Sequence, residues 1–153
     1  MQEPSERRDE DRHRIGGNMV YIKEFKITTS SNSLTKISEQ VKETIAKSGV
    51  RNGTVVVETA HSTAGILKVN VCGNEILDDI VKEMRRVIPS RINFYHQDGP
   101  ENASGHIKSS LFGTSVSLIV KDGKPICEGK QDIYFAEYDG PRERSFSVCV
   151  SGE

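Results

Sequence analysis

Short segments in which apolar and polar residues alternate constrain the fold of this chain more than any other feature of its sequence. The clearest is the β-branched run 54–59, Thr-Val-Val-Val-Glu-Thr. Strand-like segments also occur at 20–27, 64–71, 116–120, 133–137 and 146–150. A period of two places alternate side chains on opposite faces of a strand, so we expect strands with one buried face. The turn sequences at 122–125 and 139–141 join successive strands directly, which favours antiparallel pairing.

Two other stretches have the apolar spacing of an amphipathic helix. Leu34, Ile37, Val41 and Ile45 predict a helix over 34–48, with Ser33 as its N-cap and Gly49 as its C-terminal stop. Asn74 as N-cap, an apolar stripe from Ile76 to Val87 and the following Pro89 predict a second helix over 75–88. The sequence therefore predicts an α+β fold, with a mainly antiparallel sheet and two amphipathic helices on one face. The other face of the sheet also needs cover, so self-association is expected.

Length and charge restrict the organisation and the partners of the chain. Its 153 residues fit one domain, and we expect a charged flexible tail over 1–17 followed by a single domain over 18–153. The formal net charge of −1 creates no field for nucleic acid, and no apolar run reaches the roughly 20 residues of a membrane span. Neither partner is expected. Three widely separated cysteines and the absence of a signal-peptide pattern favour a cytoplasmic protein with reduced thiols.

Three of the four histidines, His61, His96 and His106, lie in short polar motifs in the middle of the chain. If the three imidazoles converge, they could bind zinc or a similar ion and leave one coordination position open. Asp79 and Asp98 could then act as further ligands or orient the rings. If the rings do not converge, they are separate polar residues with little common chemistry.

A second candidate is an anion site around the third histidine. Asn102, Lys108 and Ser109 lie close to Gly105 and His106, and combine a cation with hydrogen-bond donors. A helix that opened near Gly105 would add free backbone amides. Arg142 and Arg144 could supply further phosphate contacts, although a solvated turn is the simpler interpretation.

Glu58, Asp79, Glu137 and Asp139 lie near the ends of expected elements and are candidates for proton transfer. Glu137 alternates with the apolar Ile133 and Phe135, so its carboxylate is expected to face inward. A buried carboxylate requires a partner, which a basic residue or a metal would supply.

The order of these motifs resembles that of the YjbQ-like family. The succession comprises His61-Ser-Thr-Ala-Gly, Asp79, Tyr95-His96, the stretch from His106 to Gly113, Gly129-Lys-Gln131, Glu137 and Arg142. The family consists of small proteins, some of which are described as secondary thiamine-phosphate synthases. The likeness extends from about Val20 to Glu153 and is best over His106 to Gly113.

The resemblance implies a compact α+β protein that assembles as a homotrimer, with its three motif histidines together at a cleft between subunits. It implies a cytoplasmic transferase that joins a pyrimidine pyrophosphate to a thiazole phosphate, with zinc or magnesium as the divalent metal. The catalytic residues would be His61, His106 and Asp79, and the metal ligands His61, His96 and His106. The small phosphorylated metabolite would contact Thr63, Asn102, Lys108, Ser109, Gln131 and Arg142.

The chain departs from the family pattern at three places. Val69-Asn70 stands where an Asn-Glu pair is usual, Lys130 replaces a tryptophan, and the spacing between His96 and Asp98 is altered by one residue. Two other functions therefore stay open. One is a metal-dependent hydrolase of a small phosphorylated or acyl substrate. The other is a non-enzymatic trimeric module that binds a metabolite or anion.

Overall fold

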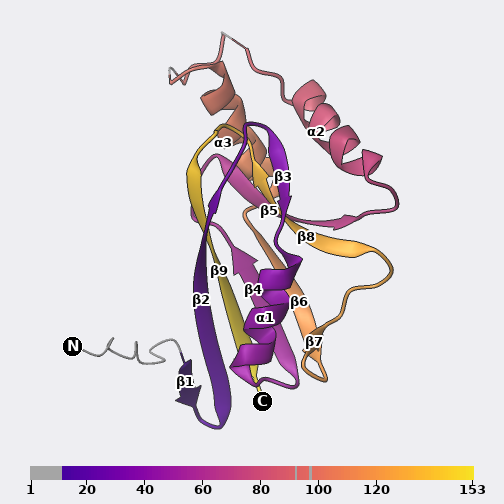
Figure 1. Ribbon diagram of the computed structural model, residues 1–153. Coiled ribbons are helices and arrows are strands. Elements are labelled where there is room, and N and C mark those ends of the chain that lie inside the picture. Colours follow the sequence, from indigo (N-terminus) through magenta and orange to yellow (C-terminus); the bar gives the residue numbers. More distant parts are fainter. Residues whose placement is uncertain (1–11, 92, 97) are drawn as a thin grey trace, which may run out of the picture.

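The computed structural model describes residues 12–91, 93–96 and 98–153, which form strands and three helices (Figure 1). The strands are β1 Arg12–Ile15, β2 Asn18–Thr28, β3 Ser33–Lys36, β4 Gly53–Glu58, β5 Ala64–Asn70, β6 Ser115–Lys121, β7 Lys124–Pro125, β8 Gln131–Glu137 and β9 Glu143–Gly152. The helices are α1 Ser38–Ser48, α2 Glu75–Val87 and α3 Pro100–Phe112. None of the helices in these ranges is long and apolar enough to cross a membrane.

The strands form two antiparallel sheets. The larger sheet has the order β1-β2-β9-β4-β6-β7, and the smaller has the order β3-β8-β5. Every strand pair in both sheets is antiparallel. This arrangement confirms the predicted α+β class, although the strands are divided between two sheets and a third helix is present.

The hydrophobic core lies between the inner face of the six-stranded sheet and a layer made of α1 and the three-stranded sheet. Val55 and Val57 of β4 and Phe146 of β9 are buried at alternate positions, as the period of two predicts. Val41 and Ile45 of α1 pack into the same cluster. The core therefore fixes the strand ends around which the polar motifs are arranged.

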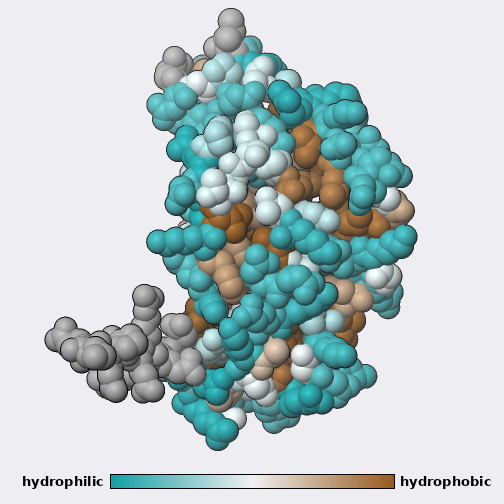
Figure 2. Space-filling model, viewed as in Figure 1, coloured by the Kyte–Doolittle hydropathy of each residue, from teal (hydrophilic) through white to brown (hydrophobic). Residues whose placement is uncertain are grey.

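The remaining helices lie beyond the three-stranded sheet, where α3 contacts β5 and α2 contacts β3. In this single chain no residue of α2 is fully buried, although the helix carries the expected apolar stripe. Figure 2 shows hydrophobic side chains gathered along the side of the molecule near α2. Helix α2 is thus the most loosely packed of the three helices.

Helix α3 approaches the sheet closely because Gly105 has no side chain. A Cβ atom at this position would lie 3.1 Å from the carbonyl oxygen of Tyr138 and 3.3 Å from the Cβ of Thr63. Both neighbours belong to rigid parts of the fold, so they cannot move aside cheaply.

The Gly105→Ala substitution is accordingly expected to lower the free energy of unfolding by about 1–3 kcal/mol, the range for overpacking a tight contact. Urea denaturation would measure the change. Ser110→Ala on the exposed side of the same helix should alter stability by less than about 0.5 kcal/mol. Equal stability of Gly105→Ala and the parent protein would contradict this account of the helix–sheet contact.

The prediction of a helix over 34–48 is wrong at its N-terminal end. Leu34, Thr35 and Lys36 belong to β3 and pair with Tyr134 to Ala136 of β8, so α1 begins only at Ser38. The N-cap position is Ile37 rather than Ser33. Backbone pairing with the neighbouring strand overrides the local helical spacing. Gly49 does end the helix in the left-handed conformation, with φ of 76°.

The sequence led us to consider a helix that opens near Gly105, whereas α3 already begins at Pro100. Pro100 occupies its first turn, a position that suits a residue without a backbone N–H. Its buried residues are small or polar, among them Ala103, Ser104 and Gly105. Because these residues produce no apolar period, the helix lacks the signal on which sequence analysis depends. The second helix is confirmed, since α2 spans Glu75–Val87 after Asn74.

The first strand lies within the segment predicted as a tail over 1–17. Arg12–Ile15 forms β1, which pairs with β2 across a turn at Gly16 and Gly17. Both glycines have positive φ, 57° and 94°, as a two-residue hairpin turn requires. All four residues of β1 are exposed, so pairing of the backbone rather than apolar burial defines this strand. The rest of the predicted tail, residues 1–11, lies outside the described residues.

Candidate functional site

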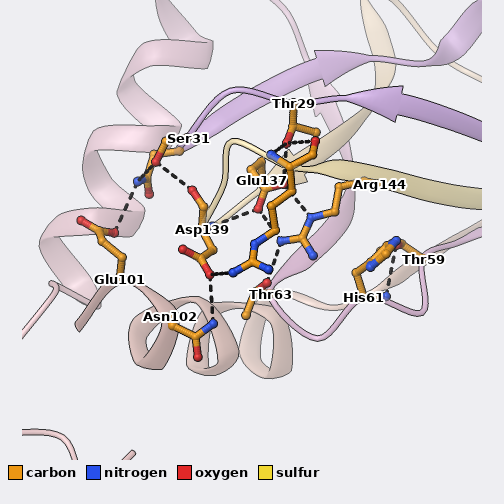
Figure 3. A network of polar contacts seen from close by, with 12 residues as sticks. Thr29, Ser31, Thr59, His61, Thr63, Glu101, Asn102, Glu137, Asp139 and Arg144 are labelled. Carbon is orange, nitrogen blue, oxygen red and sulfur yellow. Dashed lines mark hydrogen bonds and ion pairs between the residues drawn. The ribbon is translucent and has the colours of Figure 1, made fainter. Parts of the chain in front are cut away.

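A buried ion pair between Glu137 and Arg144 lies at the connection between β8 and β9. Arg144 donates from Nε to Oε2 of Glu137 at 2.7 Å and from Nη2 to Oε1 at 2.6 Å. The side chain of Glu137 is 0% exposed and that of Arg144 is 5% exposed. Thr29 donates to Oε2 of Glu137 at 2.6 Å, and Thr63 accepts from Nη2 of Arg144 at 2.7 Å (Figure 3). The pair joins β2, β5, β8 and β9 where the strands end.

The inward carboxylate predicted at Glu137 is confirmed, and its partner is a basic residue. Burial alone would raise the pKa of Glu137, but hydrogen bonds from Arg144 and Thr29 outweigh it and hold that pKa below its usual value. Glu137 is therefore ionised at neutral pH. The sequence suggested Arg144 as a phosphate contact, but its guanidinium group pairs with this carboxylate instead.

Asp139 extends the network from the ion pair to α3. Its backbone N–H donates to Glu137 Oε1 at 3.0 Å. Its Oδ2 accepts from Asn102 Nδ2 and from Arg142 Nη2, each at 2.9 Å. In Figure 3, Asn102 points from α3 toward the connection that carries Asp139. The first turn of α3 is thus tied to the end of the sheet.

Asn102 in turn orients the exposed histidine. Its Oδ1 lies 2.9 Å from Nε2 of His96, and Oδ2 of Asp98 lies 3.3 Å from the same nitrogen. The His96 and His106 rings meet edge to face, with centroids 5.0 Å apart and planes inclined by 84°. A continuous series of contacts therefore runs from Glu137 through Asp139 and Asn102 to His96 and His106.

The first histidine is held separately, by the backbone of β9. His61 follows β4, and its Nε2 accepts a hydrogen bond from the Ser145 N–H at 3.0 Å. An Nε2 that accepts must be unprotonated, so the neutral ring carries its proton on Nδ1. Burial and the nearby positive charge of Arg144 lower the pKa of His61. The ring is therefore neutral at pH 7 and acts as a hydrogen-bond donor through Nδ1.

His61 and His106 line opposite walls of one open depression of about 460 Å³. The segment Glu58–Ser62 at the end of β4 forms one wall, and the C-terminal half of α3 with Ser109 and Ser110 forms the other. We call this depression the histidine cleft. A second depression of about 410 Å³ lies on the other side of His106 and is lined by Tyr95 and His96. His106 thus borders both.

The three histidines therefore form a contacting pair and a separate ring within one chain. Among the described residues, no group of three or more His, Cys, Asp or Glu side chains is placed to hold a metal ion. Coordination through Nε2 of His61 would also break its bond to Ser145. The described residues of a single chain therefore do not bring the three histidines together at one metal site.

The structure brings together some of the other predicted site residues. Ser109 lines the histidine cleft, and Asn102 connects His96 to Asp139. Arg142 is half exposed and paired with Asp139. Thr63 is buried against Arg144, so it supports the ion pair rather than facing the cleft.

Three predicted residues lie elsewhere in the chain. Asp79 is exposed on α2, beyond the three-stranded sheet. Gln131 lies at the opposite end of β8 from Glu137, in a groove beside α1. Lys108 is buried on another side of α3 and borders a separate small hollow. A single chain does not bring any of the three into the histidine cleft.

Two contributors to the site were missed by sequence reasoning. Thr29 lies in a run of six Ser, Thr and Asn residues that reads simply as a turn, and Ser145 acts through its backbone N–H. A backbone donor leaves no signal in the residue type. Arg144 was identified as a candidate, and its burial could have been predicted because it alternates with the buried Phe146 and Val148 of the same strand.

The family model described as UPF0047 protein YjbQ-like matches residues 23–153. The chain belongs to this YjbQ-like family. The UPF0047 protein MJ1081 of Methanocaldococcus jannaschii is 39% identical to this YjbQ-like chain, over 82% of the chain and 90% of the relative. The UPF0047 protein YugU of Bacillus subtilis is 30% identical, over 82% and 94% respectively. The family resemblance proposed from the ordered motifs is thereby confirmed.

Solved structures share the fold of this YjbQ-like chain. A YjbQ-like protein of unknown function from Sulfolobus solfataricus superposes with a TM-score of 0.84 at 29% identity, covering 89% of this chain and 99% of that one. An uncharacterised protein of the family from Clostridium acetobutylicum gives a TM-score of 0.79 at 35% identity, covering 83% and 98%. The family therefore establishes the fold, and the function depends on the chemistry of the site.

Proposed function

We propose that the chain is an enzyme that binds a small phosphorylated metabolite in the histidine cleft. The observation that carries the proposal is the bond from the Ser145 amide to His61, which leaves a neutral imidazole with a fixed N–H donor at the cleft. Ser109 on the opposite wall adds a hydroxyl group, whereas the Ser110 hydroxyl donates to the His106 carbonyl oxygen at 2.9 Å. The volume of about 460 Å³ is within the range of small-molecule sites. Convergent donors of this kind suit phosphate oxygens.

The specific reaction that we propose is a secondary thiamine-phosphate synthase activity. The thiazole nitrogen would form a bond to the pyrimidine methylene carbon while the bond from that carbon to the pyrophosphate oxygen breaks. His61 and the Ser109 hydroxyl would stabilise the negative charge that develops on the departing pyrophosphate. His106, which borders the same cleft, would position the leaving group or transfer a proton to it. Magnesium would enter with the pyrophosphate rather than on the three histidines.

The purified protein is expected to form thiamine phosphate and pyrophosphate when it is given both phosphorylated substrates. Product would be measured by chromatography, with and without added magnesium or zinc. The His106→Ala variant should lose most of the activity, whereas Lys121→Ala, exposed at the far end of β6, should retain it. The gene should also rescue a thiamine-requiring strain.

Failure of the wild-type protein in both the assay and the rescue would refute the synthase activity. Thermal stabilisation by either substrate without turnover would instead support the binding module, because a ligand that binds the folded state raises its stability whether or not it reacts.

We further propose that the chain forms a homotrimer through the outer face of the six-stranded sheet. Ile22 and Val56 flank Cys149 in one row across three strands, because both pair with it in the register. Ile22 and Ile119 are 44% and 58% exposed. A contiguous apolar group on a sheet face favours contact with another protein surface. This face is the uncovered one that the sequence led us to expect.

Light scattering coupled to gel filtration should give about three times the chain mass of 17.0 kDa. Ile119→Lys places a charge in the proposed interface and is expected to shift the mass toward that of the monomer. Lys68→Glu, an exposed change on the other sheet, should leave the mass unchanged. A monomeric wild-type protein would exclude the trimer.

A further inference from the structure

A small hollow of about 10 Å³ lies beneath α2 and is separate from the histidine cleft. Its walls come from β3 with the residues just before it, from α2 through Met84 and Arg85, from α3 through Lys108, and from Tyr138. Helix α3 presents His106 and Ser109 to the histidine cleft but Lys108 to this hollow. The hollow has room for one species of about the size of a water molecule.

Two buried side chains that can donate hydrogen bonds line this hollow. Lys108 is 1% exposed, and within the described part of the chain its ammonium group makes no ion pair. The hydroxyl of Tyr138 is the buried side-chain polar atom that has no hydrogen-bond partner among the described residues. An unpaired buried hydroxyl costs free energy, and an unpaired buried ammonium group costs considerably more. An acceptor in the hollow would pair with the Tyr138 hydroxyl and offset the cost of burying the Lys108 charge.

The charges around the hollow also do not balance. Arg85 and Lys108 are cationic, and Glu101 is the nearby carboxylate that acts on Lys108. Glu101 is itself engaged, since its Oε1 lies 3.7 Å from Nη2 of Arg85 and its Oε2 accepts from Asn32 at 3.4 Å. Arg85 and Glu101 are 55% and 42% exposed at their side chains, so the charge that burial leaves uncompensated is that of Lys108. One monovalent anion would neutralise it, whereas a water molecule would not.

We propose that this hollow is a binding site for a single small inorganic anion, with chloride as the probe, held by Lys108 and Tyr138. The anion enters and is accommodated by movement of α2, no residue of which is fully buried in the described chain. The bound anion stabilises the packing of α2 against β3 and α3, and it takes no part in the chemistry of the histidine cleft. This inference does not rest on the synthase activity.

The direct test uses crystals of the full chain grown in bromide, which gives an anomalous signal. A bromide peak in contact with Lys108 Nζ supports the site. An ordered water or an empty hollow at the same position, with bromide bound elsewhere on the surface, overturns it.

A second test compares thermal unfolding in chloride and in gluconate at equal ionic strength, because gluconate is too large for the hollow. The wild-type midpoint is expected to be about 2–4 °C higher in chloride, the effect of a weakly bound ligand on a chain of this size. The difference should vanish in Lys108→Met, which keeps the length of the side chain. It should persist in Lys68→Met, an exposed control.

If Lys108→Met does not fold, Tyr138→Phe replaces it and should reduce the difference between the salts. Equal midpoints of the wild-type protein in the two salts would overturn the proposal. A difference that is the same in the wild type and in Lys108→Met would also overturn it, because the effect of chloride would then lie outside the hollow.

Discussion

Replacing Arg144 by methionine is expected to lower the free energy of unfolding by about 3–5 kcal/mol, because it leaves the carboxylate of Glu137 buried without its counter-charge. Glu137 is 0% exposed at its side chain and accepts two hydrogen bonds from the guanidinium group. Thr29 and the Asp139 N–H would still contact the carboxylate, but neither carries a charge. Urea denaturation at pH 7 would measure the loss.

The double variant Arg144→Met with Glu137→Met tests whether the loss of stability comes from the unpaired carboxylate rather than from the loss of the arginine alone. Replacing both members of a buried pair by apolar residues is often close to neutral, so the double variant should recover most of the stability. Arg142→Met, at a half-exposed residue two positions away, should cost about 1 kcal/mol or less. A small loss in the single Arg144 variant would show that Glu137 reaches solvent or becomes protonated at little cost.

Replacing His61 by alanine is expected to lower kcat/KM for thiamine phosphate formation by about 100-fold, the lower end of the range for a general acid–base or charge-stabilising group. The variant removes the Nδ1–H donor that Ser145 fixes at the cleft. Because burial and Arg144 lower the pKa of His61, the ring stays neutral through pH 7. The wild-type rate should therefore not change through an ionisation of His61 near pH 7, and its protonation should affect the rate only below the usual histidine range.

Steady-state kinetics between pH 5 and pH 8 would test both statements. The His61→Gln variant retains a side-chain N–H donor and should keep more activity than His61→Ala. Equal activity of His61→Ala and the wild type would exclude the donor role. The pH dependence of the wild-type rate could instead show an ionisation at or above the ordinary histidine pKa. If that ionisation is absent in His61→Gln, the ring is not kept neutral.

The strands were largely predictable from the sequence, because a buried face requires apolar residues at every second position. Val55 and Val57 in β4 and Phe146 in β9 show this period and are buried. The helix that carries His106 was not predictable in the same way. Its inward side is made of Ala103, Ser104 and Gly105, small residues selected for close approach to the sheet rather than for hydrophobicity.

The histidine motifs could be identified in the sequence, but their relation to one another could not. Tertiary structure places His61 under the amide of Ser145, which is 84 residues away, and separates it from the pair of His96 and His106. It also directs Lys108 away from the cleft that its neighbours line. These relations depend on strand ends that meet only after the sheets have formed.

The sequence by itself determined the family, the antiparallel α+β class and the inward carboxylate at Glu137. Each of these follows from residue order or from a local period, which the chain carries before it folds. The tertiary structure decided which partner neutralises that carboxylate, which nitrogen of His61 is protonated and which side of α3 faces the cleft. Hydrogen bonds and ion pairs form between groups that are close in space, and residues distant in the chain become neighbours only when the core packs.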